Sequence, residues 1–212
     1  MHIIAPLMYV PDHFREARPD VLHDAMRRIG FAALVTHDAA GGLEANHLPM
    51  LLDGNVLRGH VARANAVWKA GECEALAIFL GPHAYVSPSW YPSKAATGKA
   101  VPTWNYITVH AKGRIRWLQD AGWMRAHVTR LSETHESPRP EPWTIGEAPE
   151  SYIEAMLRGI VGFELEITQL DGKYKLTQNR ERADREAVRA AYEGEGREDM
   201  ARLMDVTKAN GP

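Results

Sequence analysis

The sequence has one cysteine, no long apolar run and almost no net charge. A single cysteine, Cys73, excludes a disulfide within the chain and a cysteine-rich zinc site, and it is typical of a reducing cytosol. Because no run of about 18 apolar residues is present, the sequence offers no membrane-spanning helix. No basic segment precedes the short apolar stretch at the N-terminus, which argues against a secretory signal. We therefore expect a cytoplasmic protein with no membrane partner.

The balance of charge narrows the choice of partners. The chain of 212 residues holds 25 Lys and Arg against 27 Asp and Glu, which gives a formal charge of −2. Domains that bind nucleic acid through bulk electrostatics usually present a net basic surface, so this charge disfavours that class. The length corresponds to about 1.4 average domains. We predict a single domain over residues 1–212, with a charged helical extension at about 182–208.

Several motifs of known chemistry are missing from the sequence. It has no G-x-G-x-x-G fingerprint, no P-loop and no G-x-S-x-G elbow, which disfavours nicotinamide, nucleoside-triphosphate and serine-hydrolase chemistry. Cys73 lies between two glutamates, which disfavours a reactive thiolate. We predict no metal site, because the histidines in or beside predicted strands show no metal-ligand spacing. These histidines are His47, His60, His83 and His110.

Periodicity predicts a strand-rich chain of the α+β class, mainly antiparallel and barrel-like. The clearest strand lies at 106–118, where apolar and polar side chains alternate. Its expected partner at 161–170 alternates apolar residues with glutamates, so the polar faces of the two strands carry opposite charges. A strand at 43–52 is interrupted by Pro49, which favours an edge position or a bulge. The remaining predictions are strands at 31–37, 56–62 and 75–81, and helices at 20–29, 65–71, 120–135, 150–159 and 182–208, the first capped by Asp20 and ended by Gly30.

Aromatic residues gather in one segment, residues 82–106. Five of them, Tyr85, Trp90, Tyr91, Trp104 and Tyr106, alternate there with hydroxyl, amide and lysine side chains. This mixture suits a planar ligand that bears an anionic group, because rings hold the faces, polar groups the edge and lysines the charge. The same composition is also typical of an aromatic core hairpin whose polar residues face water.

Two further clusters could bind anions. His60, Arg63 and Asn65 follow a predicted strand and open a short helix, and phosphate is often held at such a position. The stretch at 172–188 is the most basic of the chain. Its interleaved acidic residues favour a solvated charged helix over a nucleic-acid contact.

Seven motifs together resemble the PaiB-type family of FMN-binding negative transcriptional regulators. In chain order they are MYVPDHF, NHLPM, GHVARANAVW, PHAYVSPSWY, VPTWNYITVHAKG, IVGFELEI and GKYKLTQNRERADREAV. The resemblance extends from about residue 8 to about residue 190. It implies a homodimeric split β-barrel, related to the pyridoxamine-phosphate-oxidase-like flavin binders, with peripheral helices and FMN at the dimer interface. Ala66 departs from the family pattern, in which proline is more typical.

The resemblance also implies which residues bind FMN. Lys94 and Lys99 are candidate phosphate partners in a loop of unpredicted course, whereas Gln178, Asn179 and Arg180 belong to a family motif whose role stays open between the dimer interface and the fold. The other cofactor-binding candidates are His60, Arg63, Asn65, Ser87, Ser89, Trp90, Tyr91, Thr103, Trp104, Asn105 and Tyr106.

Three functions are compatible with these residues. The first is an FMN-binding regulator that acts on promoter DNA directly or indirectly, although no helix-turn-helix signature is present. The second is a flavin-dependent oxidoreductase, for which Tyr91, Tyr106 and His60 are the candidate proton donors. The third is a split-barrel protein that binds haem through a histidine, or another planar cofactor. The sequence does not identify a catalytic residue or a physiological ligand.

Overall fold

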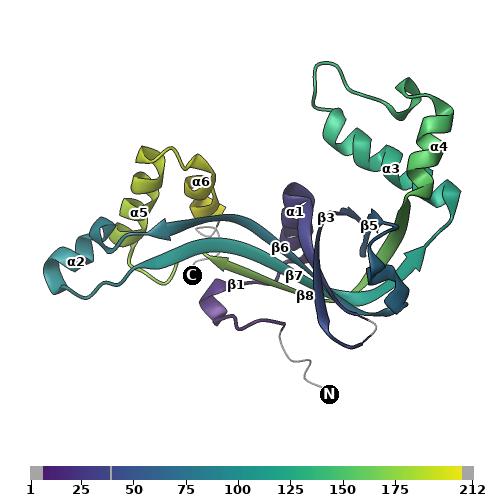
Figure 1. Cartoon of the computed structure of the whole chain (residues 1–212). Coiled ribbons are helices and arrows are strands. Elements are labelled where there is room, and N and C mark those ends of the chain that lie inside the picture. The colour runs from purple at the N-terminus through teal and green to yellow at the C-terminus, as the bar shows by residue number, and fades with distance from the viewer. Residues whose placement is uncertain (1–6, 39, 207–212) are drawn as a thin grey trace. The chain divides into compact units, whose positions relative to one another are not determined.

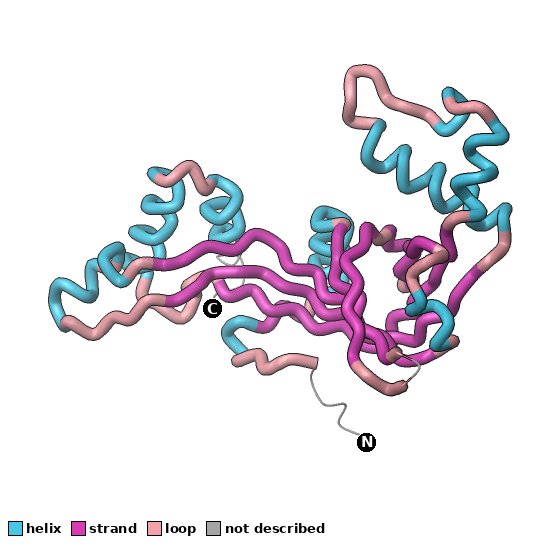
Figure 2. The backbone as a smooth tube through the Cα atoms, viewed as in Figure 1, coloured by secondary structure: helices cyan, strands magenta, loops and turns pink. Residues whose placement is uncertain are grey.

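The structure, a computed structural model, describes residues 7–38 and 40–206 (Figures 1 and 2). The chain groups into two compact units. The terminal unit comprises the chain up to residue 25, residues 80–110 and the chain from residue 171, and the central unit comprises residues 26–79 and 111–170. The three longest strands contribute residues to both units. That the chain acts as a single domain stays a prediction.

The described residues form eight strands, six α-helices and four short 3-10 helices. The strands are β1 (Arg15–Glu16), β2 (Phe31–His37), β3 (Leu43–Pro49), β4 (Leu51–Asp53), β5 (Val56–Ala62), β6 (Cys73–Val86), β7 (Thr103–Leu118) and β8 (Ile160–Lys175). The α-helices are α1 (Pro19–Ile29), α2 (Pro92–Thr97), α3 (Ala121–Glu136), α4 (Glu150–Arg158), α5 (Arg182–Gly194) and α6 (Glu198–Val206). The 3-10 helices are η1 (Asp12–Phe14), η2 (Ala66–Ala70), η3 (Pro88–Trp90) and η4 (Ile145–Glu147).

The strands, drawn in magenta in Figure 2, form a mainly antiparallel open sheet, which confirms the predicted fold class. Their order is β3-β2-β6-β7-β8-β5-β4, and β1 pairs with β8 outside this path. Strand β3 lies at an edge and ends at Pro49, as expected because proline donates no hydrogen bond to a further strand. The segment predicted at 43–52 is interrupted next to Pro49, as expected, because β3 ends there and Met50 separates it from β4.

Within the central unit, β7 alternates as the sequence predicts. Ile115 is fully buried, whereas Arg114 and Arg116 on either side of it are exposed. The sheet order places β7 beside β8, which confirms the predicted partnership of these strands. Arg116 forms an ion pair with Glu164 of β8, so the opposite charges of the two polar faces do meet.

Within the terminal unit, two helices replace the single one predicted at 182–208. The chain turns at Gly196, whose φ of 69° lies in the left-handed region that favours glycine. Helices α5 and α6 lie side by side (Figure 1), and Arg189 forms an ion pair of 3.3 Å with Asp205. Tyr192 of α5 is fully buried, with its hydroxyl oxygen 3.4 Å from the carbonyl oxygen of Tyr85 in β6. Residues 207 and 208 of the prediction lie outside the described residues.

Other predicted boundaries shift by a few residues. Strands β6 and β7 extend into the aromatic segment, to Val86 and from Thr103 respectively. Helix α1 already begins at Pro19, which places Asp20 in its first turn rather than at its cap, and it ends before Gly30 as predicted. None of the described helices is both long and apolar enough to cross a membrane.

Candidate functional site

A cavity of about 240 Å³ lies in the terminal unit, where β7 begins and β8 ends. Three of the predicted site residues, Tyr91, Thr103 and Asn105, line it. Tyr91 and Asn105 are buried, with 3% and 0% of their surface exposed. The other lining residues are Phe14, Val101, Pro102, Lys175, Thr177, Asn179 and Arg180. Apolar walls therefore surround hydroxyl, amide and cationic groups, and no described carboxylate belongs to the lining.

The two cations of this cavity lack acidic partners. The ammonium of Lys175 donates a hydrogen bond to the Thr103 hydroxyl, and the Arg180 guanidinium carbon lies 4.8 Å from the centre of the Tyr91 ring. Among the described residues, neither Lys175 nor Arg180 forms an ion pair with a carboxylate. Partial burial lowers the pKa of Lys175, and the nearby charge of Lys173 lowers it further. Burial likewise raises the pKa of Tyr91, although the Arg180 charge opposes this effect.

A buried polar pair supports the cavity from behind. The Asn105 amide nitrogen donates to the Thr177 hydroxyl at 2.8 Å, and that hydroxyl lies 3.0 Å from the Asn105 carbonyl oxygen. Thr177 has a φ of 65°, a left-handed conformation that is uncommon for a β-branched residue. The Gln178 side chain closes the turn by accepting from the backbone of Leu176 at 2.7 Å. Part of the KLTQNR motif therefore shapes the turn.

The serines and Trp90 of the aromatic segment help to build local structure. Ser87 caps η3, and its hydroxyl accepts from the backbone of Ser89 at 3.2 Å. The Trp90 ring meets the Tyr192 ring edge to face, with centres 5.5 Å apart. The hydroxyl of Ser93, which sequence reasoning did not single out, donates to the buried carboxylate of Asp184 at 2.7 Å.

Other members of the segment are exposed. Trp104 is 52% exposed, and its ring centre lies 6.2 Å from that of Tyr85. Lys94 in α2 and Lys99 just after it are both exposed. Tyr106 is half-buried and lies under the ammonium of Lys173, 5.5 Å from its ring centre. The Trp104 ring and the two lysines are therefore accessible to a ligand, whereas Tyr106 and Trp90 are each half-buried.

In the central unit, Arg63 and Asn65 already have protein partners. The Arg63 guanidinium donates to the carbonyl oxygen of Arg158 at 2.7 Å and to the Gln119 side chain at 2.7 Å. Asn65 caps η2 by accepting from the backbone of Val67 at 3.0 Å, and its amide group donates to Asn46 at 2.6 Å. The capping of a short helix was expected from the sequence, whereas the use of Arg63 as a backbone clamp was not.

His60 belongs to a buried imidazole pair in the central unit. Its Nδ1 lies 3.2 Å from Nε2 of His127, and Trp123 stacks on His127 with ring centres 5.0 Å apart. Burial lowers the pKa of both histidines, that of His127 to about 4 with help from the charges of Arg58 and Arg130. Nδ1 of His127 is buried and has no hydrogen-bond partner among the described residues. Both imidazoles are therefore neutral near pH 7.

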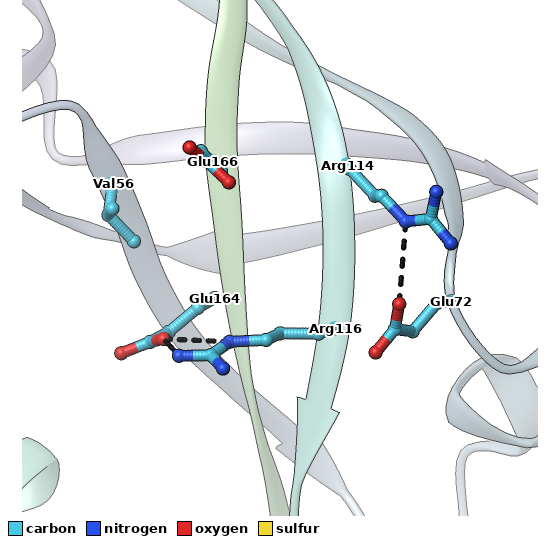
Figure 3. A pocket seen from close by; sticks show the side chains of 6 residues that line it. All are labelled: Val56, Glu72, Arg114, Arg116, Glu164 and Glu166. Carbon is cyan, nitrogen blue, oxygen red and sulfur yellow. Dashed lines mark hydrogen bonds and ion pairs between the residues drawn. The ribbon is translucent and has the colours of Figure 1, made fainter.

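A second cavity, of about 320 Å³, lies in the central unit and is lined mostly by charged residues (Figure 3). Arg116 points toward Glu164 across the cavity, and Arg114 lies 3.4 Å from Glu72. Glu164 is buried, which by itself would raise its pKa, but hydrogen bonds from Arg116 and Trp123 hold the pKa below its ordinary value. These arginines therefore carry compensated charge, unlike Lys175 and Arg180 of the terminal cavity.

A third cavity, of about 580 Å³, lies between α3 and α4 of the central unit and has Arg63 in its wall. Arg63 donates to carbonyl and amide oxygens, whereas the other cations of this wall have acidic partners, because Arg125 pairs with Glu150 and Arg158 lies 3.9 Å from Glu154. No group of three or more His, Cys, Asp or Glu side chains suited to a metal ion occurs within the described ranges.

Lys175 and Thr177 are polar cavity residues that the sequence did not assign to the site, and the apolar Phe14, Val101 and Pro102 were not assigned either. A signal was present for the two polar residues, because both lie within or beside the KLTQNR motif. What the sequence did not provide was the placement of this motif against Tyr91 and Thr103.

The fold and the terminal cavity define the class of the protein. An open antiparallel sheet with peripheral helices gives a split-barrel fold, and the cavity combines aromatic, amide and uncompensated cationic groups. The chain matches the family model described as "Putative FMN-binding domain" over residues 8–169, so it belongs to this FMN-binding domain family.

A curated relative and two solved structures are similar to this chain. The "Protease synthase and sporulation protein PAI 2" of Bacillus subtilis is 32% identical over 207 residues, which cover 93% of this chain and 97% of the relative. A protein from Bacteroides thetaiotaomicron, described as a putative 5-nitroimidazole antibiotic resistance protein, aligns with a TM-score of 0.55 at 8% identity, covering 75% of this chain and 85% of that one. The FAD and heme binding protein of Mycobacterium smegmatis aligns with a TM-score of 0.54 at 14% identity, covering 76% and 73%. At these identities the two structures support the fold alone.

Proposed function

We propose that this protein is an FMN-binding regulatory protein that works as a homodimer. The observation that carries the proposal is the terminal-unit cavity, where Lys175 and Arg180 line the same space as Tyr91 and Asn105 without a described carboxylate among them. Cations that lack acidic partners in a partly buried cavity favour an anionic ligand. Membership of an FMN-binding domain family makes the flavin mononucleotide the ligand of choice.

The residues present fit such a ligand. In the terminal unit we propose that Ser87, Ser89 and Tyr91 meet the polar edge of the flavin, and that the exposed ring of Trp104 contacts its face. The remaining proposed cofactor-binding residues of this unit are Trp90, Thr103, Asn105 and Tyr106. The exposed Lys94 and Lys99, and His60, Arg63 and Asn65 of the central unit, stay predictions from the sequence. When bound, the isoalloxazine would supply the capacity for hydride or electron transfer.

The size of the cavity supports a dimeric site. Pockets for small molecules usually occupy about 300–1,000 Å³, whereas the terminal cavity measures about 240 Å³. One copy of this cavity is therefore sized for part of a flavin. We propose that a second copy of the chain supplies the remaining surface.

Regulation is proposed to be indirect. The basic side chains that would form a DNA-binding face on β7 are compensated, since Lys112, Arg114 and Arg116 each pair with a glutamate. The net charge of −2 also disfavours binding to a nucleic-acid backbone. The name of the Bacillus subtilis relative, which refers to protease synthesis and sporulation, is consistent with a regulatory role. A specific gel shift with promoter DNA that weakens with salt would contradict the indirect mode.

The absorption spectrum of the purified protein tests the cofactor. We expect the two bands of an oxidised flavin, released as FMN on denaturation. A Soret band would instead indicate haem, which a structural relative is described as binding. Rapid bleaching by NAD(P)H, followed by turnover on an acceptor, would assign the protein to the flavin-dependent oxidoreductases. A colourless protein that takes up no added FMN would refute the proposal.

A further inference from the structure

We infer that Lys175 and Arg180, together with the Thr103 hydroxyl, form a binding subsite for a phosphate monoester in the terminal unit. The inference deepens the proposed function where the phosphate is that of FMN, and it moves the phosphate away from Lys94 and Lys99. Lys175 and Arg180 lie beyond the segment matched by the family model, whereas Thr103 lies within it.

The first observation that supports the subsite is that its two cations have no described carboxylate partner. Elsewhere in the fold a cavity cation such as Arg116 faces a carboxylate, here that of Glu164. In the terminal cavity Lys175 faces only a hydroxyl and Arg180 lies over an aromatic ring, within the part of the chain that the structure describes. Burial and the neighbouring charge of Lys173 both disfavour the charged form of Lys175. A dianion placed beside these cations would offset both effects.

The orientation of donors is the second argument. The Thr103 hydroxyl accepts a hydrogen bond from Lys175, which leaves its own proton free to be donated to a phosphate oxygen. Arg180 is held by the Tyr91 ring, and a guanidinium presents its donors in a planar fork that matches phosphate oxygens. Three donors of different type therefore line one small cavity.

The third observation that supports the subsite is the turn that positions Arg180. The backbone N–H of Arg180 donates to the carbonyl oxygen of Thr177 at 3.0 Å, which closes the turn after β8. Thr177 maintains its left-handed backbone through the buried hydrogen bonds to Asn105. Strained residues of this kind persist where the surroundings fix them, and they cluster at ligand sites.

Parallel titrations of the full chain with FMN and riboflavin, followed by flavin fluorescence, test the subsite. The two ligands differ only in the phosphate, so the ratio of their Kd values measures its contribution. We expect Lys175→Gln and Arg180→Gln each to weaken FMN binding at least about tenfold, because each variant removes one charge-assisted hydrogen bond to the phosphate, while riboflavin binding stays within about twofold. Lys175→Arg, which retains the charge, should restore part of the preference for FMN.

Two control variants separate this subsite from other basic residues. Arg182→Gln changes an exposed cation nearby that pairs with Glu186, and it should leave the ratio unchanged. The double variant Lys94→Gln/Lys99→Gln removes the alternative phosphate partners and should also leave it unchanged. If the double variant abolishes the preference for FMN while Lys175→Gln and Arg180→Gln preserve it, the inference is wrong although flavin binding stands.

A measurement without flavin tests the subsite even if the protein binds no flavin. Inorganic phosphate should raise the Tm of the protein relative to potassium chloride of equal ionic strength, and this rise should be lost in Lys175→Gln and Arg180→Gln but not in Arg182→Gln. If no flavin binds yet this pattern holds, the subsite serves a different phosphate monoester and only the proposed function fails. Two results together would overturn the subsite. The Tm rise would be absent or equal in all variants, and the ratio of Kd values would be unchanged by the substitutions or could not be measured.

Discussion

The imidazole pair of the central unit makes a quantitative prediction about acid stability. His60 Nδ1 and His127 Nε2 are 3.2 Å apart, so one of two neutral rings donates to the other. If the Nε2–H of His127 donates to Nδ1 of His60, the buried Nδ1 of His127 carries only a lone pair. If the Nδ1–H of His60 donates to Nε2 of His127 instead, His127 must carry its proton on Nδ1, and that buried N–H has no described partner. A further proton on His127 must then enter a buried position that has no described acceptor. We therefore expect acid to destabilise the fold through His127.

The magnitude follows from the pKa of His127, which falls from 6.5 to about 4 on folding. Above pH 6.5 neither the folded nor the unfolded chain is protonated at this residue, so its contribution to stability is fully retained. Between pH 6.5 and about 4 only the unfolded chain takes up the proton, and the free energy of unfolding falls as the pH falls. At pH 5 the loss amounts to about 2 kcal/mol relative to pH 8.

Urea unfolding at several pH values between 5 and 8 measures this loss. The lowered pKa values of His60, Glu16 and Asp53 act in the same direction, so the comparison is made with His127→Gln, which removes one titrating group. Between pH 6 and pH 5 the wild type should lose about 1 kcal/mol more than this variant. His135→Gln, at an exposed position on the same helix, should behave as the wild type. Equal pH dependence in wild type and His127→Gln would refute the reasoning.

Two further predictions concern the sheet of the central unit. A Cβ at Gly113 would lie 2.0 Å from the backbone oxygen of Glu166, so Gly113→Ala should lower the free energy of unfolding by about 1–3 kcal/mol. Gly146→Ala is the control, because no atom lies within 4 Å of its Cβ, and it should change the free energy of unfolding by less than about 0.5 kcal/mol. Equal Tm values for the two alanine variants would contradict the close approach of β7 and β8. Glu164→Gln should cost about 1–3 kcal/mol, because the buried carboxylate accepts from Arg116 and two other side chains. The exposed Glu166→Gln serves as its control in the same denaturation series, and a loss of equal size there would show that burial and pairing at Glu164 are unimportant.

Local patterns predicted the strands and helices well, because their causes are local. The alternation of apolar and polar residues in β7 reports directly which face is buried, and Asp120 caps α3 by accepting from the backbone of Trp123 at 2.7 Å. Failures occurred where a short backbone feature mattered. The turn at Gly196 splits the C-terminal helix, and a charged amphipathic pattern on both sides of it hides the break.

The candidate site was only partly predictable, since it depends on which residues meet. The sequence identified Tyr91, Thr103 and Asn105, but it did not show that Lys175 approaches Thr103 from 72 residues away. The sequence also does not show which lysines and arginines pair with a carboxylate in the fold. Arg63 is a phosphate candidate from the sequence, and the structure adds that its guanidinium donates to two backbone carbonyl oxygens.

Gel filtration with light scattering after incubation with FMN tests the central claim most directly. The account predicts one FMN retained per chain, on a particle with twice the mass of one chain. A particle that keeps no flavin at saturating FMN, at any mass, would contradict it.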